Sequence, residues 1–157
     1  MELVLETQED IKRRKKGMGS RNHSILQYNL ILELGIKYRK IYSFIPELSL
    51  EIEEGEKIPD LAIYKKIKAT PGYDETRMKD LPLGVIEILS PTQSLTELVV
   101  KARTYFDAGI LSYWLVAPDV RTIYVYSDSD THTVYTHKDT LVDEKLDIEL
   151  PLTTLFE

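Results

Sequence analysis

Glu87 is the residue of this sequence that most needs a chemical explanation. It stands in the centre of an apolar run, Val85-Ile86-Glu87-Ile88-Leu89, which is typical of a buried β-strand. A buried carboxylate without a partner costs several kcal/mol, or it shifts its pKa and becomes neutral. Either a cation compensates Glu87, or this strand is less buried than its composition indicates.

Asp60 and Lys101 are the two residues that could give Glu87 a chemical use. Asp60 stands at the start of an earlier predicted strand, and Lys101 lies on the helix predicted directly after the Glu87 strand. Two carboxylates at the same end of a sheet can hold Mg²⁺ through oxygen ligands, with water and phosphate oxygens completing its shell. The metal lowers the pKa of a bound water, and a lysine positions or deprotonates that water or stabilises the transition state. This is the chemistry of phosphodiester hydrolysis.

Each of these residues also has a structural explanation, which the residues alone leave open. Asp60 follows a proline and is typical of a turn or the first position of a strand. Lys101 lies four residues after Glu97, the spacing of an exposed helical ion pair worth about 0.3–0.5 kcal/mol. Glu87 has the weakest structural explanation, because its partner must still be found.

The elements that must position these residues follow from capping and periodicity. Ser20 can cap a helix over 21–34 that Gly35 ends, and Ser94 with Glu97 forms a capping box for a helix over 95–108 that Gly109 ends. Between and after these helices, the sequence predicts strands over 48–52, 58–64, 85–89 and 133–137, two more within 111–127, a turn over 53–57 and a surface loop over 68–84. This order predicts a mixed α/β fold with a central sheet.

Composition excludes several classes of protein. The chain has 157 residues, in the range of one domain, and no cysteine, so disulfides and thiolate metal sites are excluded. No apolar run approaches the roughly 18 residues of a membrane span, and no signal peptide is evident, so we expect one domain over 1–157 in the cytoplasm. With 20 Lys+Arg against 26 Asp+Glu, any phosphate contact requires a local basic patch. The cluster from Lys12 to Lys16 is either a solvated start of the first helix or a flexible basic arm over 1–19 that contacts a polyanion.

Several separated blocks resemble one family. The segments IPDLAIY, GVIEILSP, TELVVKARTYFDAGILSYWLV and LPLTTLF together are similar to the Uma-two family, whose members are predicted endonucleases of the PD-(D/E)XK superfamily. The resemblance covers about residues 43–156. It implies a restriction-endonuclease-like fold, with a central mixed β-sheet flanked by helices. It also implies a Mg²⁺-dependent endonuclease that hydrolyses DNA, with Mn²⁺ as a substitute metal.

The resemblance assigns roles to particular residues. Asp60 and Glu87 match the acids that bind the metal. In the superfamily the lysine normally follows the second acid by two residues on the same strand, where this chain has Leu89. The Uma-two pattern carries its lysine on the following helix instead, and Lys101 matches that position.

The resemblance also covers two further positions, and each of them has more than one possible role. Glu47 lies in a block similar to the family's PEL segment and is either an additional metal or supporting carboxylate or a solvent-facing strand residue. His23 matches a histidine of the family's first helix, and we expect it to be structural or to orient substrate. Asp119, in a second Pro-Asp pair, falls after Lys101 in a turn, and we reject it as catalytic.

We therefore expect a DNA endonuclease with Asp60, Glu87 and Lys101 as its core. The alternative is a catalytically silent binding or assembly module that retains the fold. Cutting both strands of a duplex needs two active sites, so we expect a homodimer. The aromatic strands within 111–127 are the candidate interface. The alternative for Trp114 is that it belongs to the core.

Overall fold

The computed structural model describes residues 7–8 and 19–157, and the predicted basic arm with the Lys12 to Lys16 cluster lies outside the described residues. A six-stranded mixed sheet forms the centre, in the order β1-β4-β5-β6-β7-β8. Only β5 and β6 pair in parallel, because the helix α3 connects them as a crossover. The sheet strands are β1 (Tyr42–Pro46), β4 (Leu61–Lys65), β5 (Gly84–Ile88), β6 (Ser112–Ala117), β7 (Thr122–Asp128) and β8 (Thr131–Thr136). The predicted fold class is confirmed.

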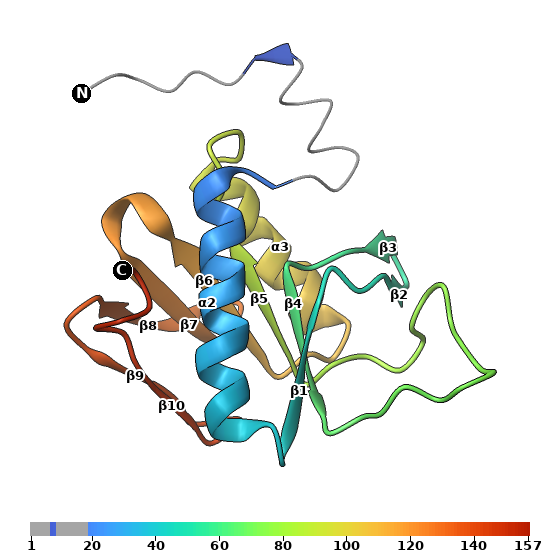
Figure 1. Ribbon diagram of the computed structural model, residues 1–157. Coiled ribbons are helices and arrows are strands. Elements are labelled where there is room, and N and C mark those ends of the chain that lie inside the picture. The colour runs from blue at the N-terminus through green and yellow to red at the C-terminus, as the bar shows by residue number, and fades with distance from the viewer. Residues whose placement is uncertain (1–6, 9–18) are drawn as a thin grey trace.

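The two helices cover opposite faces of the sheet (Figure 1). Helix α2 (Arg21–Tyr38) packs on one face through Leu26, Leu30 and Leu34. Helix α3 (Leu95–Asp107) packs on the other through Leu98, Ala102 and Tyr105. Among the described residues, no helix is both long and apolar enough to cross a membrane.

Helix α2 is longer than the sequence predicts. Its Ser20 cap is confirmed, but the helix continues through Gly35 to Tyr38 and keeps Gly35 in a right-handed helical turn. Contacts with a distant strand explain the extension. Lys37 Nζ and the Tyr38 hydroxyl both donate to the carbonyl of Glu149, and the N–H of Glu149 donates back to the Tyr38 hydroxyl.

Two short hairpins lie outside the central sheet. The predicted 48–52 strand is reduced to β2 (Leu50–Ile52), and it pairs with β3 (Gly55–Lys57) inside the predicted 53–57 turn. The sequence analysis missed β1 and the second hairpin, β9 (Thr140–Asp143) with β10 (Ile148–Pro151). That hairpin covers the α2 face of the sheet, because Leu141, Ile148 and Leu150 belong to the same core as α2.

The aromatic strands proposed as a dimer interface are interior. They correspond to β6 and β7, which are joined by the short 3-10 helix η1 (Pro118–Val120), an element without a buried residue. Tyr113 and Trp114 are fully buried, one in each of the two cores that sandwich the sheet. Trp114 is therefore core, and this part of the interface prediction is wrong.

Candidate active site

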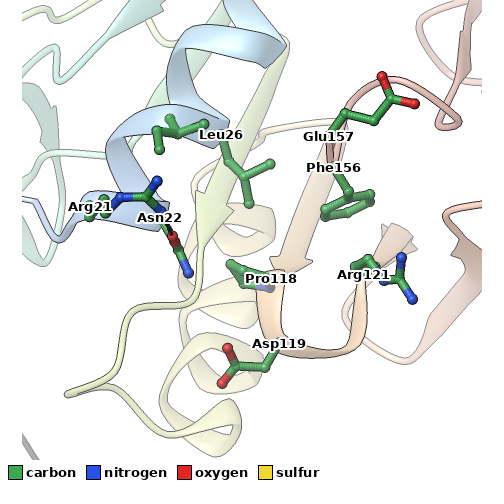
Figure 2. A pocket seen from close by; sticks show the side chains of 9 residues that line it. Arg21, Asn22, Leu26, Pro118, Asp119, Arg121, Phe156 and Glu157 are labelled. Atoms are coloured by element: carbon green, nitrogen blue, oxygen red, sulfur yellow. Dashed lines mark hydrogen bonds between the residues drawn. The ribbon is translucent and has the colours of Figure 1, made fainter. Parts of the chain in front are cut away.

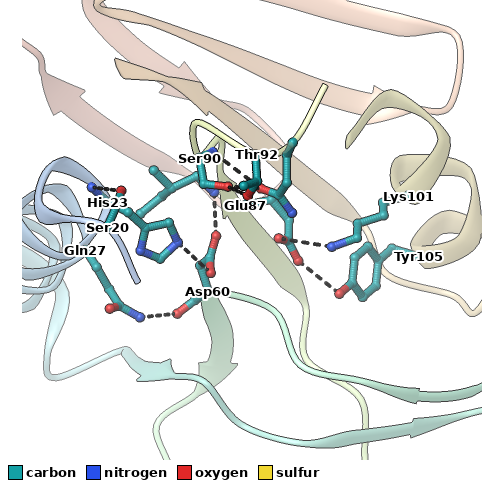
Figure 3. A network of polar contacts seen from close by, with 11 residues as sticks. Ser20, His23, Gln27, Asp60, Glu87, Ser90, Thr92, Lys101 and Tyr105 are labelled. Atoms are coloured by element: carbon teal, nitrogen blue, oxygen red, sulfur yellow. Dashed lines mark hydrogen bonds and ion pairs between the residues drawn. The ribbon is translucent and has the colours of Figure 1, made fainter. Parts of the chain in front are cut away.

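Glu87 lies inside the molecule, in the middle of β5. The residue is only 2% exposed. Its side chain faces α3, as does that of Val85, whereas Ile86 and Ile88 face the core on the other side of the sheet. Glu87 Oε1 accepts a hydrogen bond from the Tyr105 hydroxyl at 3.1 Å, and Oε2 lies 3.8 Å from Lys101 Nζ (Figure 3). A cation does compensate this carboxylate, but only at the outer limit of an ion pair.

Asp60 stands beside Glu87 because of the pairing of two strands. Strand β4 pairs antiparallel with β5, with Leu61 opposite Ile86, so one further step along this register places Asp60 opposite Glu87. Asp60 Oδ2 accepts a hydrogen bond of 2.7 Å from the N–H of Ile88. Gln27 of α2 donates to its carbonyl oxygen at 2.8 Å. Both the backbone and the carboxylate of Asp60 are thereby fixed at the end of β4.

The pKa of Glu87 reflects this environment. Burial raises it most, and the negative charge of Asp60 raises it further, to about 8. The charge of Lys101 and the hydrogen bonds from Tyr105 and Lys101 act in the opposite direction without cancelling these effects. Two carboxylates therefore share a site in which one cation does not offset their charge.

Helix α3 brings Lys101 and Tyr105 to Glu87 from successive turns. The spacing of four residues places both side chains on one face of the helix. Lys101 is 37% exposed, so its ammonium lies between the buried carboxylate and solvent. No ion pair joins Lys101 to Glu97 within the described part of the chain. The structure thus favours the Glu87 partnership over the predicted alternative.

Tyr105 is a site residue that the sequence analysis missed. It is 1% exposed, and burial together with the nearby Glu87 raises its pKa, so the phenol stays protonated and donates to Glu87. The usable signal was the Lys101 to Tyr105 spacing, since a buried tyrosine hydroxyl normally needs a partner.

His23 approaches Asp60 from the other face of the sheet. Its Nε2 lies 2.8 Å from Asp60 Oδ1, although the ring is not aligned for a hydrogen bond, and its Nδ1 has no partner among the described residues. The imidazole is 2% exposed and therefore cannot contact a large substrate without rearrangement. This placement agrees with a structural role more than with substrate orientation.

Glu47 and Asp119 lie outside the cluster of side chains. Glu47 is exposed, with φ of 49°, and only its backbone approaches the site, where its N–H donates to the Asp60 carbonyl at 3.3 Å. Asp119 lies in η1 and lines a hollow of about 430 Å³ with Arg21, Arg121 and Phe156. Figure 2 shows this hollow, and neither Asp60 nor Glu87 lines it.

The donor set fits a hard cation only in part. Asp60 and Glu87 offer carboxylate oxygens, which Mg²⁺ prefers, and Mg²⁺ usually retains several waters and takes only one or two protein carboxylates. Glu87 has spare acceptor capacity beyond Tyr105 and Lys101. No group of three or more His, Asp or Glu ligands gathers anywhere in residues 7–8 and 19–157, so Glu47 is not brought in as a third ligand.

Comparisons with known proteins agree with the observed fold. A family model, Uma2, described as "Putative restriction endonuclease", matches residues 9–155. A solved structure, that of a putative nuclease belonging to DUF820 from Anabaena variabilis ATCC 29413, superposes with a TM-score of 0.75. It is 22% identical, and the match covers 88% of this chain and 82% of that chain, so it shows a shared fold. No curated protein matches the chain. Because the family model spans nearly the whole sequence, this protein belongs to the Uma2 family of restriction-endonuclease-like proteins.

Proposed function

We propose that this protein is a Mg²⁺-dependent endonuclease that hydrolyses phosphodiester bonds in DNA. Family membership supports a nuclease-like function. The single observation that carries the proposal is the placement of Glu87, a carboxylate buried beside Asp60 and only loosely paired with Lys101. Such an arrangement is unfavourable for folding, which makes a ligand-binding role the better explanation for it.

Asp60 and Glu87 are the residues that would hold the metal. The Ile88 N–H and the Gln27 amide fix Asp60, and Tyr105 orients Glu87, so both carboxylates are held in place by neighbouring donors. When bound, Mg²⁺ supplies a water of lowered pKa and neutralises charge on the phosphate. A cation held there would also offset the charge of Asp60, which adds to the effect of burial in raising the pKa of Glu87.

Lys101 is the residue that would contact the substrate. Its ammonium lies 3.8 Å from Glu87 Oε2 and is 37% exposed, so a phosphate that approaches from solvent can reach it. There it stabilises the negative charge that develops on phosphate oxygens or holds the attacking water. Tyr105 is too buried to take this part and acts on Glu87 alone.

The deciding experiment is Lys101→Ala, assayed by Mg²⁺-dependent cleavage of plasmid DNA. We expect cleavage to be lost, while folding and calorimetric Mg²⁺ binding change little, because the lysine is partly exposed and is not a metal ligand. Lys101→Arg should rescue poorly, since the guanidinium is bulkier and stays protonated. Glu97→Ala is the matched control on the same helix and should cleave like the wild type.

One outcome would remove Lys101 from the proposal, and another would overturn the proposal as a whole. If Lys101→Ala cleaves as well as the wild type, the lysine is not catalytic. If the wild-type protein neither binds Mg²⁺ or Mn²⁺ nor cleaves DNA, the protein is the silent module, with the nuclease fold retained for binding or assembly.

A further inference from the structure

Helix α2 has a second apolar face that nothing in the described structure covers. Its inner face, with Leu26, Leu30 and Leu34, packs on the sheet. Its outer face carries four large apolar side chains in one row, which we call the α2 stripe. The stripe consists of Ile25, Tyr28, Leu32 and Ile36, with exposed fractions of 38%, 63%, 43% and 74%. In Figure 1 this helix lies in front of the sheet, whereas α3 lies behind it.

The spacing of the α2 stripe is that of a helix–helix contact. Its members are separated by three, four and four residues, so they form one continuous row along the helix. Isolated exposed apolar residues are ordinary, but a contiguous patch of them indicates an interaction site. No Asp, Glu, Lys or Arg occurs between Arg21 and Glu33, so the part of this face over Ile25, Tyr28 and Leu32 lacks the charges that solvate an exposed helix.

Gly35 is a second, independent feature of the same helix. It lies next to Ile36 inside the helix, where glycine is less favourable than alanine. A Cβ at this position would meet no atom within 4 Å, and the backbone is in an ordinary helical conformation. The protomer's own packing therefore gives no reason for glycine here, whereas close approach of another helix does.

The composition of the α2 stripe selects its partner. Nucleic acid requires cations, and the stripe has none along its length. A second copy of this chain fits, because the row reads nearly the same in both directions, with isoleucine at each end and larger or equal side chains between. In an antiparallel pair related by a two-fold axis, Ile25 meets the partner's Ile36, and Tyr28 meets the partner's Leu32. Apolar surface then meets apolar surface along the whole row.

The available area sets the strength of this contact. A standard interface buries about 800 Å² on each partner. A helix of 18 residues is about 27 Å long, so a single helix pair supplies the centre of such an interface and needs additional surface. Val120, which is 63% exposed, adds apolar surface on η1, an element in contact with α2. We propose that the protein forms a two-fold symmetric homodimer through antiparallel packing of the α2 stripe, with a Kd in roughly the micromolar range.

The test is the oligomeric state of matched variants in analytical ultracentrifugation between about 1 and 100 µM. The wild type is expected to be dimeric at the upper end of this range. Tyr28→Lys and Ile36→Lys should raise the Kd by at least about 100-fold while leaving thermal unfolding of the protomer unchanged, because both side chains are more than 60% exposed. Val100→Lys on α3, at 62% exposure, is the matched control and should dimerise like the wild type.

A second measurement uses the absence of cysteine from the chain. Tyr28→Cys should be linked between two copies by a short bismaleimide, and Val100→Cys should not. A wild type that stays monomeric at about 100 µM overturns the proposal. So does a dimer that survives both lysine substitutions in α2, or one that Val100→Lys dissociates. Catalysis is not a readout in either experiment, so the outcome does not depend on the proposed nuclease function.

Discussion

Two buried carboxylates in this molecule have opposite surroundings. Asp143, at the end of β9, is 1% exposed and accepts hydrogen bonds from three donors: the Ser112 hydroxyl, Trp114 Nε1 at 2.7 Å and the N–H of Leu146 at 3.1 Å. Glu87 is 2% exposed, but within the described part of the chain it has only one neutral donor, the Tyr105 hydroxyl, with Lys101 Nζ at 3.8 Å. The two carboxylates are therefore equally buried, but Asp143 accepts more hydrogen bonds than Glu87 does.

The difference separates a structural carboxylate from one that is available to a ligand. Asp143 joins the β9–β10 hairpin to β6, because two of its donors lie on β6 and the third lies in the hairpin turn. Its hydrogen bonds replace those that water made in the unfolded chain. Glu87 lacks such replacement and faces a second carboxylate, so its burial opposes folding. We expect substitutions at the two sites to have opposite consequences.

The largest expected effect is on activity at Glu87. Glu87→Gln keeps the size of the side chain and its ability to accept from Tyr105, but it removes the charge that would hold the metal. We expect Mg²⁺-dependent cleavage to fall by at least about 10³-fold, since metal and electrostatic stabilisation each contribute several kcal/mol. Single-turnover cleavage and calorimetric Mg²⁺ binding measure it. Near-normal Mg²⁺ binding by this variant would remove Glu87 from the metal site.

The next effect is on stability at Asp143. Asp143→Ala leaves the Ser112 hydroxyl, the Trp114 indole N–H and the Leu146 N–H buried without an acceptor. We expect the free energy of unfolding to fall by about 3 kcal/mol. Urea denaturation at constant m-value measures the loss. Glu87→Gln is the comparison variant and should be at least as stable as the wild type at pH 8. An equal loss in both variants would contradict the distinction between the two carboxylates.

A third effect is the pH dependence of stability in metal-free buffer containing a chelator. Burial and Asp60 raise the pKa of folded Glu87 to about 8, above the ordinary value of 4.5 in the unfolded chain. Between these values the folded protein binds more protons than the unfolded chain, so the contribution of Glu87 to stability is fully present below pH 4.5 and is lost as pH rises through 8. We expect the wild type to lose on the order of 4 kcal/mol more than Glu87→Gln between pH 5 and 9. Parallel pH profiles for the two proteins would show that Glu87 is not the group responsible.

The sequence identifies Glu87 more readily than Asp143 for a physical reason. Glu87 interrupts a continuous apolar run, so its burial and its need for a partner are visible in five consecutive residues. Asp143 lies in VDEKLD, which is typical of a solvated turn, and it is buried only because the hairpin packs on β6. Helix α3 was predictable because its capping box and its end at Gly109 are local signals.

The features that sequence analysis missed depend on contacts between distant residues. Strand β1 is defined by pairing with β4, and the last turn of α2 is held by Glu149. Tyr105 belongs to the candidate site through one hydrogen bond to a residue on a strand that precedes its helix. Periodicity within a single segment does not encode any of these contacts.

The smallest expected effect concerns the one neutral donor to Glu87. Tyr105→Phe removes the hydroxyl that hydrogen-bonds to Oε1 and leaves the packing of the ring intact. This hydrogen bond lowers the pKa of Glu87, so its loss raises that pKa further and reduces the ionised fraction at pH 7. We expect cleavage at pH 7 to fall about tenfold, equivalent to about 1.4 kcal/mol, and to recover toward the wild-type rate above pH 9.

Tyr113→Phe is the matched control, because Tyr113 is equally buried and its ring lies against Tyr105. Its hydroxyl donates to the carbonyl of Leu98 at 2.8 Å and not to either carboxylate. Loss of that hydrogen bond should reduce stability by about 1 kcal/mol and leave the pH profile of cleavage unchanged. If Tyr105→Phe, like the control, lowers stability but leaves the pH profile of cleavage unchanged, Tyr105 only fills the α3 core. If both variants shift the pH profile equally, the shift comes from general loosening of that core. Only a shift specific to Tyr105 shows that this hydroxyl sets the ionisation of Glu87.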